Sequence, residues 1–332
     1  MNRRYRSLVA GLVLALLAWS AGAAEAPTVL SGFDPVLLVE GKEVKGSEEL
    51  SEVEGRFRYL FATPENRDRF RADPERFAVQ NDGQCAAMPG VPGSPELFTV
   101  HAGKLYLFGG ESCRRAFEAT PGLFIGEIPR RKVAILVFEG VELLDLAGPG
   151  EVFAAAGHGA AFEVYTVAAT REPVVSQGFL EIKPRFAIAD APPPDLLVVP
   201  GGVGVRSLVE SPEMMAWIRA TAARAEVVLS VCNGAFVLAE AGLLDGLEAT
   251  THGSSIEGLR RRASRTRVVE GVRFVDNGRV VTAAGVSAGI DASLHLLARL
   301  FGETEAQRTA RYLEVLGRGE GRVVPVPAAG GR

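Results

Sequence analysis

Glu226-Val-Val-Leu-Ser-Val-Cys-Asn-Gly-Ala-Phe236 is the stretch that decides the fold of this chain. Residues 226–231 form an apolar strand candidate, Cys232 follows it at once, and a helical pattern continues to about Ala241. Gly234 permits close packing at the junction. The stretch predicts a sharp strand-to-helix turn with a cysteine at its tip.

The same alternation of strand and helix patterns continues before and after this stretch. Residues 132–138 are a continuous apolar run, as expected for a parallel strand covered on both faces. Further strand candidates are 162–167, 196–200 and 279–283, and amphipathic helices are expected at 212–225 and 287–301. This alternation predicts a doubly wound α/β domain with a mainly parallel sheet.

Cys232 lies at a position that suits a nucleophile. A turn between a parallel strand and a helix N-terminus offers exposure, nearby backbone N–H groups and a helix dipole that favours a thiolate. We therefore expect a functional thiol with a lowered pKa. The alternative is a small buried hydrophobic residue.

The glycine turn after the strand at 196–200 is expected beside this cysteine, because ligands in open α/β sheets bind at the carboxyl ends of the strands. Gly201 and Gly202, together with Asn233, are candidates for an oxyanion or substrate-binding site. The alternative is a flexible turn.

Asp145 lies among leucines after the first strand, and a buried acid needs a partner. Placed against Cys232, it would serve as a protonated hydrogen-bond donor or as a general acid/base. The alternative is a helix N-cap.

The N-terminus has the order of a secretory signal peptide. Three arginines among the first six residues precede an apolar run at 8–19, and small residues follow at 21–24. The run is too short to span a bilayer comfortably. We expect cleavage after residues 1–23 and a periplasmic or secreted protein with no stable membrane insertion; an uncleaved anchor is the alternative.

Export changes the interpretation of the three cysteines, because an even set tends to pair in an oxidising compartment. We expect a disulfide between Cys85 and Cys113 and a free thiol at Cys232. These two cysteines and His101 lack the close spacing of a dedicated metal site, so no metal is expected; metal binding there is the alternative. No phosphate-binding fingerprint indicates another cofactor.

Length and charge set the organisation and the partners. The chain has 332 residues with 47% hydrophobic and 23% charged residues, enough for two globular domains. A net charge of −4 and the lack of a dense basic stripe give no reason to expect nucleic-acid binding. We expect a small α+β domain at 28–126, a linker at 127–131, the α/β domain at 132–316 and a disordered tail at 317–332.

Residues 28–126 resemble a YHS-like domain of the exported kind. Within them a strand is expected at 56–61, a helix opening at Thr63, a hairpin turning at Ala102-Gly103 and a short helix at 112–119. The resemblance is carried by Gly32-Phe33-Asp34-Pro35-Val36, Asp73-Pro74, Cys85 and Gly103-Lys104-Leu105-Tyr106-Leu107.

Residues from 132 to about 317 resemble the ThiJ/PfpI superfamily, within the class I glutamine amidotransferase-like fold. The similar branch is that of isonitrile hydratase and of the sensor domains of AraC-type regulators. The matching residues are Glu142-Leu-Leu-Asp-Leu-Ala-Gly-Pro149, Val199-Pro-Gly-Gly202, Ser230-Val-Cys-Asn-Gly-Ala235, Ala241-Gly-Leu-Leu-Asp-Gly246, Ala249-Thr-Thr-His252 and Thr282-Ala-Ala-Gly285.

The resemblance implies Cys232 as nucleophile, Asp145 as its acidic partner and His252 as the histidine that approaches the thiol. From the residues alone, His252 is a strand-end residue with a satisfied hydrogen bond. The implied activity is that of a cofactor-free hydratase, hydrolase or lyase acting on a small electrophilic molecule, in a chain that could form a homodimer. The alternatives are a redox or ligand sensor using Cys232, and a binding scaffold with an inactive α/β domain.

This chain departs from the family pattern at several points. Asn233 stands where isonitrile hydratase-like members have Thr and peptidase-like members have His. Asp145 is one methylene shorter than the Glu of glyoxalase-like members. AraC-type regulators continue into a helix-turn-helix domain, which we do not expect after Leu316.

Overall fold

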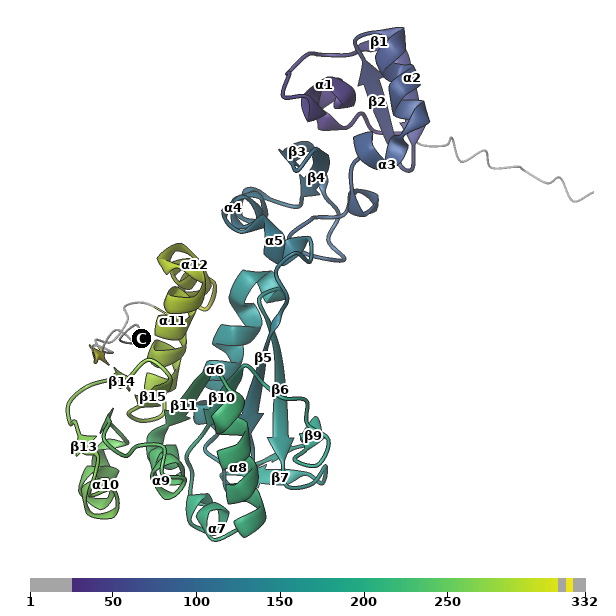
Figure 1. Ribbon diagram of the computed structural model, residues 1–332. Helices are drawn as coiled ribbons and strands as arrows, with labels where there is room; N and C mark the ends of the chain where they lie inside the picture. Colours follow the sequence, from purple (N-terminus) through teal and green to yellow (C-terminus); the bar gives the residue numbers. More distant parts are fainter. Residues whose placement is uncertain (1–25, 316–320, 325–332) are drawn as a thin grey trace, which may run out of the picture. The chain divides into compact units, whose positions relative to one another are not determined.

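The computed structural model describes residues 26–315 and 321–324, and divides the chain into two compact units at Ala78/Val79 (Figure 1). The expected domain boundary near residue 127 lies inside the second unit. Leu123 joins the hydrophobic core of the α/β domain together with Phe153 and Phe162, which ties the segment before residue 127 to that domain. Residues 1–23, which the sequence predicts to be a signal peptide, lie outside the described part of the chain.

The first unit packs a two-stranded antiparallel sheet against short helices. The predicted strand and helix are confirmed: β2 (Phe57–Phe61) pairs with β1 (Ser47–Glu54), and the Thr63 hydroxyl caps α2 (Pro64–Ala72) by accepting from the N–H of Asn66. The remaining helices are α1 (Pro35–Val39) and α3 (Pro74–Phe77). Whether this unit is YHS-like stays a prediction.

The carboxylate of Asp34 holds the first unit together. It is fully buried and accepts four hydrogen bonds: from the N–H groups of Val36 (2.9 Å), Leu37 (3.2 Å) and Ala62 (2.8 Å), and from Nδ2 of Asn66 (2.8 Å). These donors belong to α1, to the residue after β2 and to α2. A buried charge is tolerated only with such a set of partners.

The second unit begins with a hairpin and two short helices. Strands β3 (Ser94–His101) and β4 (Lys104–Phe108) pair antiparallel, and Ala102 and Gly103 turn between them with φ of 48° and 72°. The predicted hairpin is therefore confirmed, and its first strand starts four residues earlier than expected. Helices α4 (Glu111–Ala119) and α5 (Pro121–Phe124) follow.

The α/β domain is built on an eight-stranded sheet with the order β16-β14-β15-β11-β10-β5-β6-β9. Within the described residues all neighbouring strands are parallel except β14 and β15. The five predicted strands are confirmed within two residues. The strands are β5 (Arg131–Leu136), β6 (Phe162–Ala168), β9 (Phe186–Ala187), β10 (Leu196–Val199), β11 (Val227–Val231), β14 (Phe274–Asp276), β15 (Val280–Ala283) and β16 (Arg322–Val323).

Helices cover both faces of this sheet. Along β5, Ala134 and Leu136 join one apolar cluster while Val133 and Ile135 join another, so neither face is left to solvent. The first cluster is closed by α7 (Val205–Val209), α8 (Pro212–Arg224), α9 (Ala235–Glu240) and α10 (Ile256–Arg262), the second by α6 (Leu143–Ala155), α11 (Ala288–Phe301) and α12 (Glu303–Tyr312). This confirms the predicted three-layer α/β architecture.

Short strands complete the domain. β7 (Val174–Ser176) pairs with β8 (Leu180–Ile182), and β12 (Glu248–Ala249) with β13 (Arg267–Val268). Within the tail at 317–332, which the sequence predicts to be disordered, β16 pairs with β14, and the Val324 N–H donates to the carbonyl of Asp276 at 2.8 Å. The other tail residues lie outside the described part. Among the described helices, none is long and apolar enough to cross a membrane.

Candidate active site at Cys232

Cys232 lies at the carboxyl edge of the sheet on a strained turn. It follows β11 directly, opens a 3-10 turn (Cys232–Gly234) before α9, and has a φ of 57°, which is uncommon for a residue with a side chain. Gly234 is required there, because a Cβ atom would lie 2.2 Å from the carbonyl oxygen of Val199. The hydroxyl of Thr251 donates to the Cys232 carbonyl at 2.8 Å and braces the turn. The predicted elbow is confirmed.

Asp145 faces the thiol from the first turn of α6. Its carboxyl is fully buried, and Oδ2 accepts a hydrogen bond from the N–H of Gly201 at 2.9 Å. Within the described residues Oδ1 has no hydrogen-bond partner. Burial raises the pKa of Asp145 to about 7, and the charge of Glu142 adds to the rise. Glu142 occupies the N-cap position of α6, so Asp145 is not the cap.

The thiol itself differs from our expectation. Burial first, and the charge of Asp145 second, raise the pKa of Cys232 to about 12. The backbone N–H groups of Asn233 and Val286 lower the pKa but do not outweigh these effects. The expected lowering is therefore wrong for the free site, because desolvation and a neighbouring carboxylate both oppose a second negative charge. The resting cysteine is a protonated thiol.

The glycine turn serves a different purpose from the expected one. The N–H of Gly201 is donated to Asp145, and the N–H of Gly202 is donated to Oδ1 of Asn233 at 2.7 Å. Nδ2 of Asn233 in turn donates to the Gly202 carbonyl at 3.0 Å. Both candidate oxyanion donors are thus already engaged in holding the turn. The Asn233 side chain is a clamp between this turn and the elbow.

Val286 supplies a donor that the sequence did not reveal. Its backbone N–H lowers the pKa of both the Cys232 thiol and the Asp145 carboxyl. Its φ of 46° is an outlier for a β-branched residue, and such strain tends to persist at functional sites. Only its backbone is used, so no residue type marks the position. The nearby motif Thr282-Ala-Ala-Gly285 was the one feature of the sequence that pointed to this segment.

His252 lies near the elbow without contacting the thiol. Its Nδ1 is 2.8 Å from Oγ of Ser254, and its ring packs on Gly285, where a Cβ atom would lie 2.3 Å from Cδ2. It directly follows Thr251, the residue that braces the elbow. No hydrogen bond joins His252 to Cys232 among the described residues, so the catalytic role of His252 stays a prediction.

A cavity of about 630 Å³, whose lining includes neither Cys232 nor Asp145, carries negative charge near the start of α6. Glu139 and Glu142 line it together with Gln177, Val203 and Gly204. Oε1 of Glu142 accepts a hydrogen bond from Nε2 of Gln177 at 2.5 Å, which fixes the carboxylate in place. Its charge raises the pKa of both Asp145 and Cys232. Glu142 belongs to a recognisable sequence motif, but its effect on the two pKa values could not be predicted from that motif.

The other two cysteines lie in the hairpin segment of the second unit. Cys85 and Cys113 are buried free thiols in one apolar cluster. Burial, and then the Cys85 thiol, raise the pKa of Cys113. The disulfide stays a prediction. In the described residues no three His, Cys, Asp or Glu side chains are grouped to hold a metal ion.

A doubly wound sheet with a cysteine on a strained elbow and a buried acid beside it defines the structural class of this α/β domain. The sequence model of the DJ-1/PfpI family matches residues 131–299, half of the chain. This chain belongs to the DJ-1/PfpI family.

Relatives in the family have different functions. The chain is 37% identical to the isonitrile hydratase of Pseudomonas putida over 183 residues, 55% of this chain and 78% of that protein. It is 28% identical over 175 residues to the HTH-type transcriptional regulator GbdR of Pseudomonas aeruginosa, 52% of this chain and 47% of the regulator. The branch within the family therefore stays a prediction.

Solved structures agree on the fold. A ThiJ/PfpI family protein from Pseudomonas syringae matches with a TM-score of 0.53 and 31% identity, over 61% of this chain and 80% of that one. Drosophila melanogaster DJ-1beta matches with a TM-score of 0.50 and 21% identity, over 57% of this chain and all of that one. The second likeness concerns the fold alone.

Proposed function

We propose that this chain is a cofactor-free, cysteine-dependent hydratase that adds water to a small isonitrile. The observation that carries the proposal is the buried Asp145 carboxyl, with a pKa of about 7, beside the Cys232 thiol. A general base works best when its pKa is close to the working pH. At neutral pH this carboxyl exists in both forms, so it can accept and return one proton. The similarity to isonitrile hydratase supports the choice of substrate.

The first step joins the enzyme to the substrate. Asp145 removes the proton from the thiol as sulfur attacks the terminal carbon of R–NC, so the S–H bond breaks and a C–S bond forms. Asp145 then returns the proton to that carbon and leaves a thioimidate, R–N=CH–S–Cys232. A thiol with a raised pKa needs such a base, because little thiolate is present at rest.

The second step releases the product. Water adds to the thioimidate carbon, one proton goes to nitrogen, and the C–S bond breaks with its electron pair on sulfur. The departing sulfur recovers a proton through Asp145, and the N-substituted formamide leaves. The N–H groups of Asn233 and Val286, which lower the pKa of the Cys232 thiol, stabilise the negative charge on sulfur in both steps.

The test uses purified full-length protein and alkyl and aryl isonitriles. We expect loss of isonitrile and equimolar formamide by NMR, and a thioimidate adduct on the Cys232 peptide in mass spectra of acid-quenched samples. Cys232→Ser and Asp145→Asn should each reduce turnover by about 100-fold or more. Full turnover by Cys232→Ser, or no formamide from any isonitrile, would refute the proposal.

A second candidate is a redox sensor that uses the same thiol. It is favoured by the unpaired Oδ1 of buried Asp145, which could donate a hydrogen bond to an oxidised sulfur when protonated. The similarity to transcriptional regulators is compatible with sensing. Mild peroxide followed by peptide mass spectrometry decides: selective sulfenic or sulfinic acid at Cys232 supports this candidate, and its absence excludes it.

We also propose that the protein works outside the cytoplasm. The support is the basic, apolar and small-residue order of residues 1–24. N-terminal sequencing of protein from separated cell fractions tests this. A start near Ala24 in the periplasmic or secreted fraction is expected, and intact protein in the cytoplasm would contradict it.

A further inference from the structure

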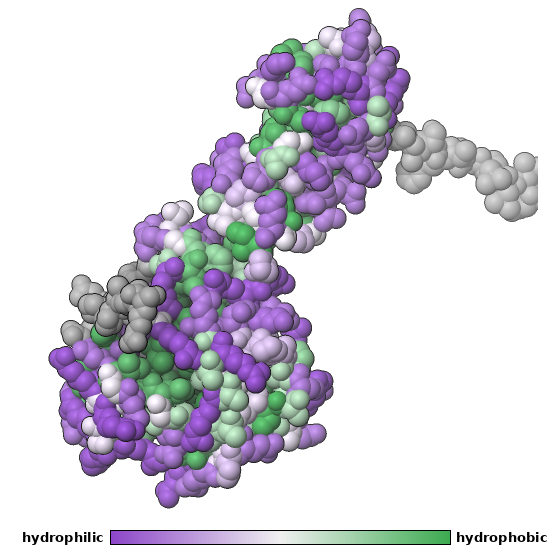
Figure 2. All heavy atoms as spheres, viewed as in Figure 1, coloured by the Kyte–Doolittle hydropathy of each residue, from purple (hydrophilic) through white to green (hydrophobic). Residues whose placement is uncertain are grey.

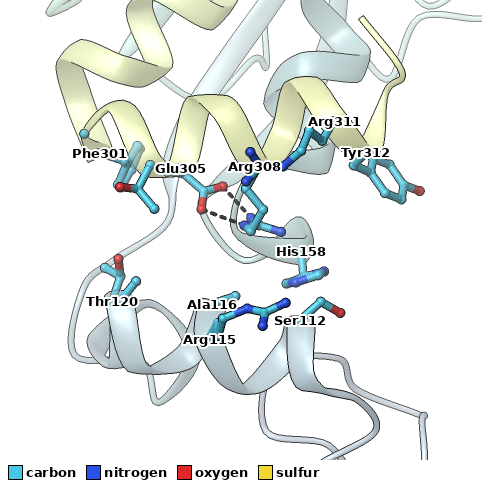
Figure 3. Close-up of a pocket in the computed structure, with 13 residues that line it drawn as sticks. Ser112, Arg115, Ala116, Thr120, His158, Phe301, Glu305, Arg308, Arg311 and Tyr312 are labelled. Atoms are coloured by element: carbon cyan, nitrogen blue, oxygen red, sulfur yellow. Dashed lines mark hydrogen bonds and ion pairs between the residues drawn. The ribbon is translucent and has the colours of Figure 1, made fainter.

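A second cavity, also of about 630 Å³, lies within the second unit between α4 and α12 (Figure 3). Arg115 and Ala116 line it from α4, Arg308 and Arg311 line it from α12, and His158 and Phe301 complete its wall. Of these residues only His158 falls within the stretch matched to the DJ-1/PfpI family. Most of the residues that line this cavity therefore lie outside the stretch matched to the family.

This cavity is remote from Cys232. Helix α11 begins two residues after Val286, at the carboxyl edge of the sheet, and runs 14 residues to Phe301 at the cavity. At 1.5 Å per residue the helix spans about 20 Å. A molecule in this cavity would not contact the thiol.

The charges of the cavity leave Arg311 without an ion pair among the described residues and Arg115 with only a weak one. Glu305 accepts hydrogen bonds from Nη2 and Nε of Arg308, at 2.5 and 3.0 Å, and from the N–H of Gly157 at 2.7 Å, so this pair neutralises itself (Figure 3). Arg311 has no ion pair among the described residues. Arg115 lies 4.0 Å from Glu111 on an exposed helix face, and such pairs contribute little.

The remaining wall is apolar or uncharged. Ala116 is buried, and Ala119, Phe301 and Tyr312 add apolar surface. Burial, and then the charge of Arg308, lower the pKa of His158, which keeps its ring neutral. Its Nε2 has no hydrogen-bond partner in the part of the chain that the structure describes. The cavity thus combines an apolar body with a cationic rim.

We propose that this cavity binds an organic carboxylate with an apolar chain. The guanidinium groups of Arg115 and Arg311 pair with the carboxylate, since arginine binds planar anions in a bidentate manner. The chain lies along Ala116 and Phe301. A volume of about 630 Å³ is ordinary for a small-molecule site and accommodates an acid of medium length.

Calorimetric titration of the full-length protein with decanoate, below its micellar range, tests the proposal. We expect saturable binding that weakens by about tenfold or more in the double variant Arg115→Gln/Arg311→Gln. The matched control is Arg224→Gln/Arg261→Gln, two exposed arginines elsewhere in the unit, which should bind within about twofold of the parent. Ala119→Trp fills the cavity without changing its charge and should abolish binding.

Three results would overturn the proposal: no saturable binding of decanoate, equal affinity in the double variant and the parent, or equally tight binding of neutral decanamide. Circular dichroism of each variant distinguishes lost binding from lost folding. Ala119 is exposed, so its replacement leaves the core intact. Alkylation of Cys232 should be unchanged in all variants, which keeps this test independent of the proposed hydratase activity.

Discussion

Asp145 is fully buried and Cys232 is half-buried, and the charge of Asp145 makes the ionisation of the thiol harder. Burial is the largest cause of both raised pKa values. The carboxyl is the first of the two to lose its proton, so near neutral pH the pair carries at most one negative charge. Taking the thiol proton therefore depends on Asp145 and not on a preformed thiolate.

Asp145→Asn should separate the reactivity of the thiol from turnover. Removing the carboxylate charge lowers the pKa of Cys232, so alkylation by iodoacetamide at pH 8 should become faster, by about tenfold, although turnover is lost. Peptide mass spectrometry over a pH series measures the alkylation rate. Glu139→Gln is the control and should behave as the parent. Slower or unchanged alkylation in Asp145→Asn would contradict the charge interaction.

Glu142→Gln should move the pH dependence of turnover. The charge of Glu142 raises the pKa of Asp145, so its removal lowers that pKa. If the ionised carboxylate is the base, turnover rises with pH through about 7 in the parent, and the rise should occur at lower pH in the variant, by up to about one unit. The pH–rate profile of kcat/KM measures this.

Glu139→Gln is again the matched control, because Glu139 lines the same cavity but is not among the groups that raise the pKa of Asp145. A profile that moves equally in both variants would mean that general charge in the cavity, rather than Glu142 itself, sets the pKa of Asp145.

At the scale of elements, the turn after β10 and the elbow after β11 are held together by one side chain. Asn233 pairs with both the N–H and the carbonyl of Gly202, much as a neighbouring strand would. Gly201 must be glycine, because a Cβ atom there would lie 2.2 Å from Oδ1 of Asn233. The N–H of Gly201 in this turn donates to the carboxyl of Asp145. The geometry of the acid thus depends on contacts between two loops.

Asn233→Ala should lower the free energy of unfolding by about 2 kcal/mol, because two backbone groups lose their partners. It should also alter the alkylation rate of Cys232. Asn277→Ala is the control: Asn277 is similarly half-buried and donates to the Glu248 carbonyl at 2.8 Å. We expect a comparable loss of stability in urea unfolding but an unchanged alkylation rate of Cys232. Equal alkylation in the two variants would show that the clamp does not shape the site.

At the scale of the whole molecule, the chain consists of two compact units with separate cores. Asp34→Ala leaves four donors in the first unit without their acceptor and should destabilise that unit by about 3 kcal/mol. Calorimetry should show a lowered transition for the first unit only, with Cys232 alkylation unchanged. Asp68→Ala, at an exposed position, is the control. A uniform loss of stability would argue against independent units.

The molecular surface is mixed, with polar and apolar side chains interspersed over each unit (Figure 2). Among the described residues, Val203, Tyr312 and Phe179 are the most exposed large apolar side chains of the α/β domain, at 88%, 71% and 70%. Val203 lines the cavity beside Glu142, so part of the exposed apolar surface lies close to the candidate active site.

The sequence by itself determined the α/β class, the central strands, the elbow at Cys232 and the presence of Asp145 near it. These follow from local pattern, because apolar runs and strand-to-helix turns depend on neighbouring residues. Tertiary structure decided the direction of the Cys232 pKa, the use of the Gly201 and Gly202 N–H groups and the donor at Val286. It also decided that the chain divides after Ala78 and that the tail adds an edge strand. Each of these depends on burial and on contacts between residues distant in sequence, which no local pattern records.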